Sequence, residues 1–205
     1  MVAPSSPRVT EVVLEGPACP NREAEGAPAG GLDRLTAAIA DVLDIGGDVD
    51  VVTSRIAAVM TEALQREDLL PLFAGRQKSF AAFADPQRHF IVHCSVHRPG
   101  HLTEAHDHGE AWAVYGVVRG RSRYRRYRRD EDVAHGRAGL IGERDAELLP
   151  GQTDIVQPGH VHLIANETIE PVWNLVVRPR PIEEIWRRRY DLSSGTYGIH
   201  PNSLP

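Results

Sequence analysis

The sequence predicts a mainly β domain, a sandwich or barrel of short strands, preceded by a small helical cap. From about Arg88 onward, apolar residues alternate with a period of two and Gly and Pro interrupt the pattern often. Before that point, apolar residues recur at helical spacing. The chain has 205 residues and a mass of 22.6 kDa, with 41% hydrophobic residues, which is enough for one domain with a sizeable core.

Composition excludes several classes of protein. A hydrophobic share of 41% beside 25% charged residues rules out a wholly disordered chain. The longest apolar runs are four to five residues, so we expect no membrane span, and the N-terminus lacks the apolar stretch of a secretory signal. Two cysteines, Cys19 and Cys94, cannot build a disulfide scaffold or a four-cysteine zinc site. We expect a cytoplasmic protein, and the net charge of −5 argues against general nucleic-acid binding.

The N-terminal part divides into a leader and a helical cap. Residues 1–30 are rich in Pro, Gly, Ala and Glu and predict a flexible leader, with one short strand near residues 9–14. Residues 31–80 predict the cap: a first helix that stops at Gly46-Gly47, and a second that either Asp48 or Asp50 caps. Residues 81–205 predict the β barrel, which forms one structural domain with the cap.

Seven segments of the barrel region predict strands, and turn residues separate them. The candidate strands are residues 89–96, 112–118, 121–129, 146–149, 153–156, 160–165 and 172–178, with turns at Gly120, 136–142, 150–151 and 158–159. Residues 182–190 fit either a strand or a helix, and a last strand is possible after Ser193.

Histidines are the unusual feature, because six of the ten fall between His89 and His108. His106 and His108 are two residues apart, so on a strand their imidazoles project from the same face. Two nitrogen ligands that lie near 2 Å from one ion must converge in this way. Solvent-exposed strand histidines are the alternative. His89, His93, His97 and His101 recur every fourth residue, and we interpret them as solvated or as supporting the site.

A second motif strengthens the metal interpretation. Gly100 precedes His106 by five intervening residues, and the segment from Gly151 to Asn166 follows the pattern G(x6)P(x3)H(x3)N, which contains His162. About four short strands fit between His108 and His162, which is enough to bring a second hairpin opposite the first. These two motifs together resemble those of the cupins, which implies a double-stranded β-helix, or jelly-roll barrel.

Within the cupins, the chain most resembles the cysteine dioxygenase family of thiol dioxygenases. The HxH motif, Trp112–Gly120, the run from Glu170 to Pro179 and the preceding helices carry this resemblance over about residues 31–200. It implies one Fe(II) on His106, His108 and His162, and oxidation of a small anionic thiol by O2 to a sulfinate, in a monomer or homodimer.

The absence of a ligating carboxylate fits this family. Many cupins place a glutamate four or five residues after HxH, whereas this chain has Trp112 and Ala113 there, and Glu110 is out of the usual place. Three neutral ligands leave the ion its full double charge and open positions for a thiolate, a second substrate group and O2. His160, two residues before His162, supports the site or contacts substrate in our interpretation; a role as a fourth ligand is the alternative.

The chain departs from the family on the late strand. Asn174, Val176 and Arg178 stand where family members carry a Ser, His, Tyr trio, and Ala113 replaces a cysteine that is cross-linked in some members. We infer that Arg178 binds an acidic substrate group through charge-assisted hydrogen bonds.

Further candidate residues complete the predicted site. We assign catalytic roles to His160, Arg178 and Tyr115, the last as a replacement for the missing tyrosine. Candidates for substrate binding are Arg178, Arg76, Arg187, Trp173 and Asn174. Seven arginines between residues 119 and 129 predict an exposed strand or a funnel for anions.

Two other functions compete with thiol oxidation. The missing trio favours an O2-dependent reaction on carbon at the same site, such as cleavage of a dicarbonyl or catechol-like compound. A non-catalytic cupin that binds a metal or small ligand is the third hypothesis.

Overall fold

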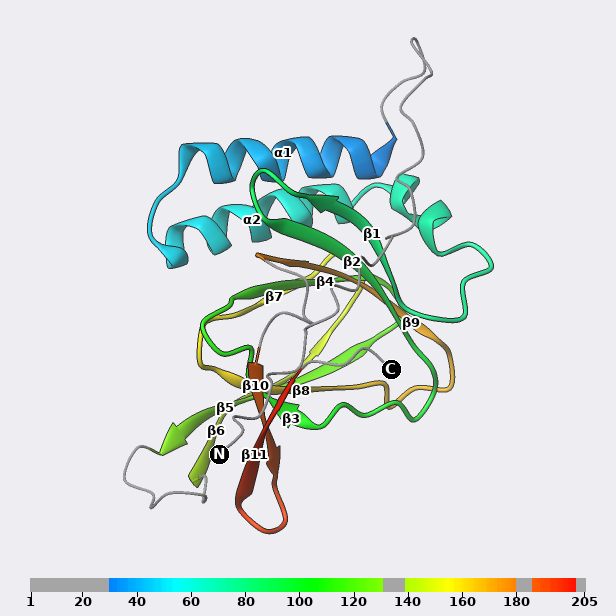
Figure 1. Ribbon diagram of the computed structural model, residues 1–205. Coiled ribbons are helices and arrows are strands. Elements are labelled where there is room, and N and C mark those ends of the chain that lie inside the picture. The colour runs from blue at the N-terminus through cyan, green and yellow to red at the C-terminus, as the bar shows by residue number, and fades with distance from the viewer. Residues whose placement is uncertain (1–29, 131–138, 180–185, 202–205) are drawn as a thin grey trace, which may run out of the picture.

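The computed structural model describes residues 30–130, 139–179 and 186–201, and Figure 1 shows their arrangement. The predicted leader, its strand near residues 9–14 and Cys19 lie outside the described residues. Within the described part of the chain, no helix is both long and apolar enough to cross a membrane.

Three helical elements precede the strands, and the two longer ones are the helices that the sequence predicts. They are α1 (Gly31–Ile45), α2 (Val49–Leu64) and a 3-10 helix, η1 (Glu67–Phe73). Gly46 ends α1 with a φ of 69°, a backbone conformation that glycine adopts more easily than residues with a side chain. Asp48 rather than Asp50 caps α2, because its carboxylate accepts a hydrogen bond of 2.8 Å from the backbone N–H of Val51.

Eleven strands follow within the described residues and form two antiparallel sheets. They are β1 (Phe80–Asp85), β2 (Phe90–His97), β3 (Ala105–His106), β4 (Ala113–Arg119), β5 (Ser122–Asp130), β6 (Gly139–Leu148), β7 (Thr153–Val156), β8 (Val161–Ala165), β9 (Val172–Arg178), β10 (Trp186–Asp191) and β11 (Thr196–Pro201). One sheet has the order β1-β2-β9-β4-β7, and the other has the order β11-β10-β3-β8-β5-β6. The fold is therefore mainly β, a double-stranded β-helix with helices at its N-terminus.

The observed strands differ from the predicted ones in several places. The sequence does not predict β1, because its residues FAAFAD alternate only weakly in hydrophobicity. β6 begins at Gly139 rather than at residue 146, since it pairs with the whole of β5 in a long hairpin. The described part of residues 182–190 is strand β10, which pairs with β3 and β11.

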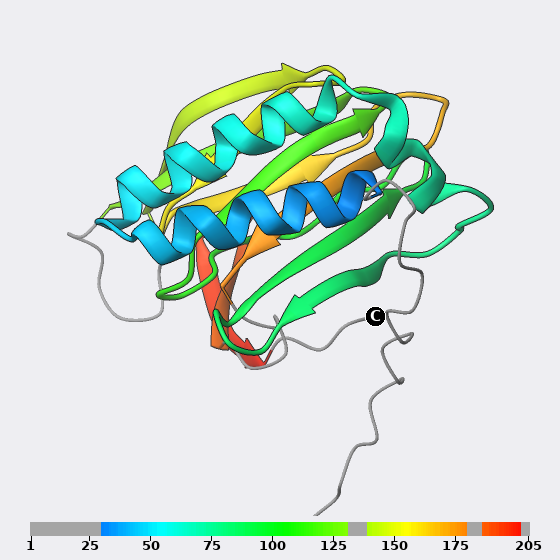
Figure 2. The ribbon, with the colours of Figure 1, turned by 90° about the horizontal axis from the view of Figure 1, so that it is seen from above.

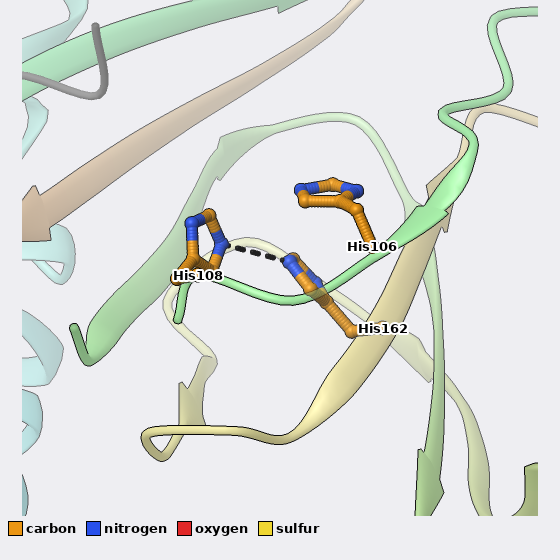
Figure 3. Close-up of side chains that lie close together, drawn as sticks. All are labelled: His106, His108 and His162. Carbon is orange, nitrogen blue, oxygen red and sulfur yellow. Dashed lines mark hydrogen bonds between the residues drawn. The ribbon is translucent and has the colours of Figure 1, made fainter. Parts of the chain in front are cut away.

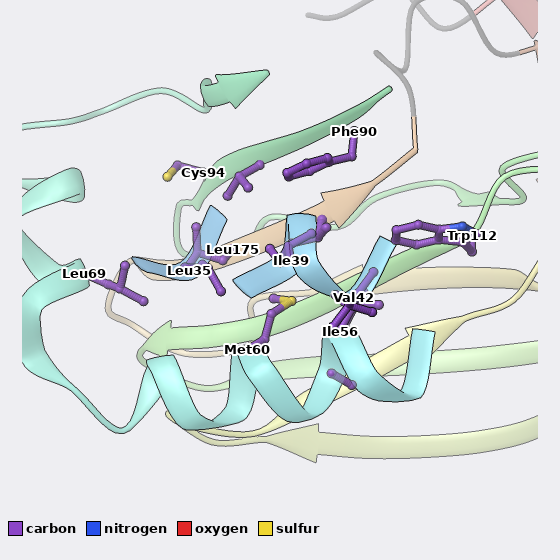
Figure 4. Close-up of a cluster of buried hydrophobic side chains, with 14 of the residues drawn as sticks. Leu35, Ile39, Val42, Ile56, Met60, Leu69, Phe90, Cys94, Trp112 and Leu175 are labelled. Atoms are coloured by element: carbon purple, nitrogen blue, oxygen red, sulfur yellow. The ribbon is translucent and has the colours of Figure 1, made fainter. Parts of the chain in front are cut away.

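The main hydrophobic core lies between the helices and the outer face of the five-stranded sheet. Figure 2 shows α1 and α2 lying across that sheet, and Figure 4 shows the side chains between them. On β9, Leu175 and Val177 belong to this core, whereas Val176 belongs to a second cluster inside the barrel. Because strand residues alternate between faces, Asn174, Val176 and Arg178 face the barrel interior.

Candidate metal centre

The six-stranded sheet lines the barrel interior with a row of histidines and arginines. Residues paired across antiparallel strands project from the same face of the sheet. The pairings run from strand β10 to strand β6 through Arg189, His106, His162, Arg126 and Arg144. Register therefore places His106 beside His162 although 56 positions separate them in the sequence.

The five-stranded sheet presents a second interior row. Its paired residues, from β2 to β7, are His93, Val176, Tyr115 and Asp154. Tyr115 and Val176 pack together in the interior cluster, and Asp154 and His93 are both buried. The interior of the barrel therefore carries a polar row on each sheet.

His106 and His162 of the first row converge with His108, as Figure 3 shows. One ligand atom from each of His106, His108 and His162 lies within 4.8 Å of the others, and Nε2 of His108 is 3.0 Å from Nε2 of His162. All three rings are buried, with exposed fractions of 7% or less. β3 ends at His106, so His108 lies in the loop just beyond the strand on which the sequence placed it, yet its ring still turns toward His162.

Hydrogen bonds orient two of these rings. The Nδ1 of His106 lies 2.8 Å from the carbonyl oxygen of Glu104, so this nitrogen donates and Nε2 keeps its lone pair for a metal. The hydroxyl of Tyr115 lies 3.1 Å from Nε2 of His108. Tyr115 thus reaches the centre from the opposite sheet.

Asp107, between the two histidines of the HxH motif, anchors their loop to the C-terminal hairpin. Its carboxylate is 1% exposed. It accepts hydrogen bonds from the Tyr190 hydroxyl at 2.9 Å, from the backbone N–H of Arg188 at 3.0 Å and from that of Gly109 at 3.1 Å. A carboxylate held by three donors fixes the loop, and with it the directions of the flanking imidazoles.

Burial keeps the three imidazoles neutral. It lowers the pKa of His106 to about 4 and the pKa values of His108 and His162 well below their usual range. The charge of Arg187 lowers all three pKa values further. Neutral imidazole is the form that binds a metal, so the donor set fits a divalent cation.

Arginines give this part of the barrel a positive potential. The Arg178 side chain is buried at 6% exposure, and its charge contributes to lowering the pKa values of His108 and His93. Arg187 is half-buried, and its own pKa is lowered, first by burial and then by the charge of Arg189. Arg126 donates to the carbonyl oxygen of Ile155 at 2.8 Å and lies 3.9 Å from the buried carboxylate of Asp154. Arg178 and Arg187 are the arginines whose charges act on His108, so they are the candidates to bind an anion.

Two of the predicted substrate-binding residues face away from the barrel interior. Trp173 stacks on Phe73 at 5.2 Å between ring centroids, within the core beneath the helices. Arg76 is exposed, with its guanidinium 4.5 Å from the centroid of the Phe80 ring, which also packs on that core. Neither residue lies in the barrel interior, because Trp173 packs beneath the helices and Arg76 lies in the exposed segment between η1 and β1.

The other predicted residues lie closer to the centre but not all in it. Asn174 faces the interior and is fully buried, but its Nδ2 donates to Nδ1 of His97 at 3.3 Å. His160 is half-buried, its charge acts on Asp154, and it is not a member of the histidine group. Glu110 is exposed and is not a member either.

Sequence reasoning did not assign the buried polar residues that surround the centre. His93, Arg126 and Asp154 occupy the interior rows, but their positions follow from strand register. Tyr190 holds Asp107 from a hairpin more than 80 residues further along the chain. The placement of Asp107 inside the HxH motif was an available signal, because a carboxylate next to ligands often orients them.

The arginine-rich strand β5 is not a free anion funnel on its outer face. Arg123 and Arg125 form ion pairs with Asp145 and Glu167 at 2.6–3.8 Å. Arg121 pairs with Glu147 at 3.7 Å. Outward-facing positive charges of the strand are therefore largely balanced by acids on β6 and after β8, in agreement with the exposed-strand interpretation.

No family model matches the chain, and no curated protein matches it. Solved structures similar to it are cupin-fold proteins. A Cupin_2 domain of an XRE family transcriptional regulator from Enterobacter cloacae is 18% identical, with 50% of this chain and 95% of that chain covered and a TM-score of 0.39. A protein with a double-stranded β-helix domain from Klebsiella pneumoniae is 16% identical, with 62% and 89% covered and a TM-score of 0.36. A sugar phosphate isomerase of the cupin superfamily from Silicibacter pomeroyi is 19% identical, with 56% and 68% covered and a TM-score of 0.36.

Proposed function

We propose that the protein is a mononuclear non-haem iron dioxygenase that oxidises a small anionic thiol, a thiol carboxylate, to a sulfinate. The observation that carries the proposal is the convergence of three neutral, buried imidazoles next to Arg178 and Arg187. The residues fit a metal, because Nδ1 of His106 donates a hydrogen bond to the carbonyl oxygen of Glu104 and leaves Nε2 available as a ligand.

His106, His108 and His162 would hold the ion. Fe(II) bound there would supply electrons to O2 and positive charge to stabilise a thiolate. The overall conversion of R–S⁻ and O2 to R–SO2⁻ places both oxygen atoms on sulfur, so the balance requires no external reductant.

The chain's own residues bind and orient the substrate in this proposal. Arg178 and Arg187 attract its carboxylate, since both bring positive charge to the ligand histidines. Burial raises the pKa of Tyr115, so its hydroxyl keeps its proton at neutral pH. That hydroxyl, 3.1 Å from Nε2 of His108, is placed to donate a hydrogen bond to a group bound at the centre.

Oxygen uptake with a thiol panel tests the proposal. The protein is loaded with Fe(II) without oxygen, mixed with cysteine, 3-mercaptopropionate or 2-mercaptoethanol, and then exposed to O2. We expect O2 consumption and a product heavier by two oxygen atoms with a thiol carboxylate, and neither with His162→Ala. Absence of O2 consumption with every thiol would contradict the proposal.

Oxidation at carbon is the second candidate function. Asn174, Val176 and Arg178 at the interior of β9 favour it, because they replace the Ser, His, Tyr trio of the thiol dioxygenases. With ¹⁸O2, thiol oxidation puts both labelled atoms on sulfur, whereas dicarbonyl or catechol cleavage puts them on carbon. Tight binding of a metal and one metabolite without turnover would support a non-catalytic role instead.

A further inference from the structure

A His–Ser pair on β2 faces the interior of the barrel and has no role in the centre described above. Nδ1 of His93 lies 3.2 Å from the hydroxyl oxygen of Ser95. His93 is 8% exposed. Its neighbours Val92 and Cys94 point into the core beneath the helices, so strand alternation turns His93 toward the interior.

Strand register places His93 in the same interior row as Tyr115. His93 pairs with Val176 on β9, and Val176 pairs with Tyr115 on β4, whose hydroxyl contacts His108. Only the Val176 side chain therefore separates His93 from Tyr115 across the sheet.

Arg178 links His93 to the metal centre electrostatically. It lies two residues from Val176 on the same face of β9, and its charge acts on His93, His108 and Tyr115 alike. Burial, and then this charge, lower the pKa of His93 to about 4. The imidazole is therefore neutral at physiological pH and carries one N–H.

Ser95 contacts one nitrogen of this ring. Its hydroxyl lies within hydrogen-bond distance of Nδ1, where it can donate or accept; when it donates, the imidazole hydrogen is on Nε2. Within the described residues, the His93 ring forms this hydrogen bond through Nδ1. An Nε2–H near the Arg178 guanidinium would give two donors suited to an oxyanion.

We propose that His93, oriented by Ser95, is a substrate-binding residue whose Nε2–H joins Arg178 in binding the carboxylate of the substrate. This inference rests on the proposed function for the identity of the ligand as a thiol carboxylate. It goes beyond that function because it assigns a recognition residue on a strand that supplies no metal ligand. It also assigns a chemical preference, for carboxylates over neutral thiols.

Nuclear magnetic resonance of the histidine rings tests the contact directly. The full-length chain, loaded with diamagnetic Zn(II) and labelled with ¹⁵N-histidine, is titrated with propionate, which has the carboxylate but no thiol. We expect propionate to shift the Nε2 resonance of His93, identified with the His93→Gln variant, and propionamide to leave it unmoved. An unchanged His93 resonance at saturating propionate would overturn the inference.

Variants test the same contact by a second route. Because a hydrogen bond to a charged group is lost, we expect His93→Gln to weaken propionate binding about 10- to 100-fold. Ser95→Ala keeps the imidazole but frees its tautomer, and we expect a smaller loss of about three- to tenfold. The matched control is His101→Gln, an exposed histidine, which we expect to bind as the wild type does. If all three variants bound propionate as tightly as the wild type, the proposal would be contradicted.

The thiol assay separates this inference from the proposed function. With an active enzyme, we expect His93→Gln to raise KM for 3-mercaptopropionate at least tenfold and to leave KM for 2-mercaptoethanol within twofold. A purely structural role would raise both. If no thiol is oxidised but propionate shifts His93, the proposed function fails and the carboxylate site stands. If thiols are oxidised and His93 does not respond, only this inference fails.

Discussion

Mild acid should destabilise the protein through His97, a histidine on β2 four residues beyond His93. Its ring is 8% exposed and stacks on His101 at 4.3 Å between centroids. Its Nδ1 accepts a hydrogen bond from Asn174. Burial, followed by the charges of His101 and His93, lowers its pKa to about 3. The proposed perturbation is His97→Gln, which keeps an acceptor for Asn174 and removes the titrating group.

The size of the effect follows from that pKa. The imidazole of the unfolded chain takes up a proton near pH 6.5, whereas the folded protein resists protonation down to about pH 3. Stability is therefore unaffected by this group above pH 6.5 and falls as the pH drops through the window between the two values. The loss is about 1.4 kcal/mol per pH unit and reaches about 2 kcal/mol at pH 5.

Urea unfolding at several pH values between 7 and 4.5 measures this effect. We expect the unfolding free energy of the wild type to fall more steeply with acid than that of His97→Gln, by about 1.4 kcal/mol per pH unit. The exposed His89→Gln is the matched control and should keep the wild-type slope. Identical slopes for wild type and His97→Gln would refute the burial argument.

Three further predictions concern packing, the loop anchor and the free thiol. A Cβ at Gly116 would lie 2.5 Å from Cδ1 of Leu64 on α2. We therefore expect Gly116→Ala to lower the free energy of unfolding by about 1–3 kcal/mol in urea titrations. An unchanged urea midpoint would contradict close packing of α2 on β4. Tyr190→Phe removes a hydrogen-bond donor to Asp107. We expect this variant to bind metal about tenfold more weakly, measured by competition with a chelator. Unaltered affinity would show that the β10–β11 hairpin does not position the ligands. Burial raises the pKa of the Cys94 thiol to about 12. We therefore expect iodoacetamide at pH 8 to leave Cys94 unmodified in the folded protein, as measured by peptide mass spectrometry. Rapid alkylation would refute its burial.

Local spacing made part of the site predictable from the sequence. Motif spacing identifies the HxH pair and the distant His162 as candidate metal ligands. The period-two pattern of the strands places alternate residues on one face. The convergence of these three residues in the structure depends on one pairing, His106 with His162, which the two motifs suggested but could not fix.

Strand register, and the choice of the sheet face that the helices cover, account for the site residues that the sequence does not predict. Trp173 and Arg178 lie on the same strand five positions apart, and only the packing of α1 and α2 decides which of the two faces is buried beneath helices. Arg126 looked like one of many exposed arginines until pairing with His162 placed it inside. His93 resembled its histidine neighbours in sequence, and its proximity to Arg178 follows from the pairing of β2 with β9.

Binding of one metal ion per chain by three imidazoles underlies the proposed function. Anaerobic titration with Fe(II), followed by calorimetry and X-ray absorption spectroscopy, tests it most directly. We expect one ion per chain with three imidazole nitrogens, loss of binding in His162→Ala, and unchanged binding in His160→Gln and Glu110→Gln. Stoichiometric binding that survives His162→Ala, or a carboxylate ligand from Glu110, would contradict a centre of three histidines.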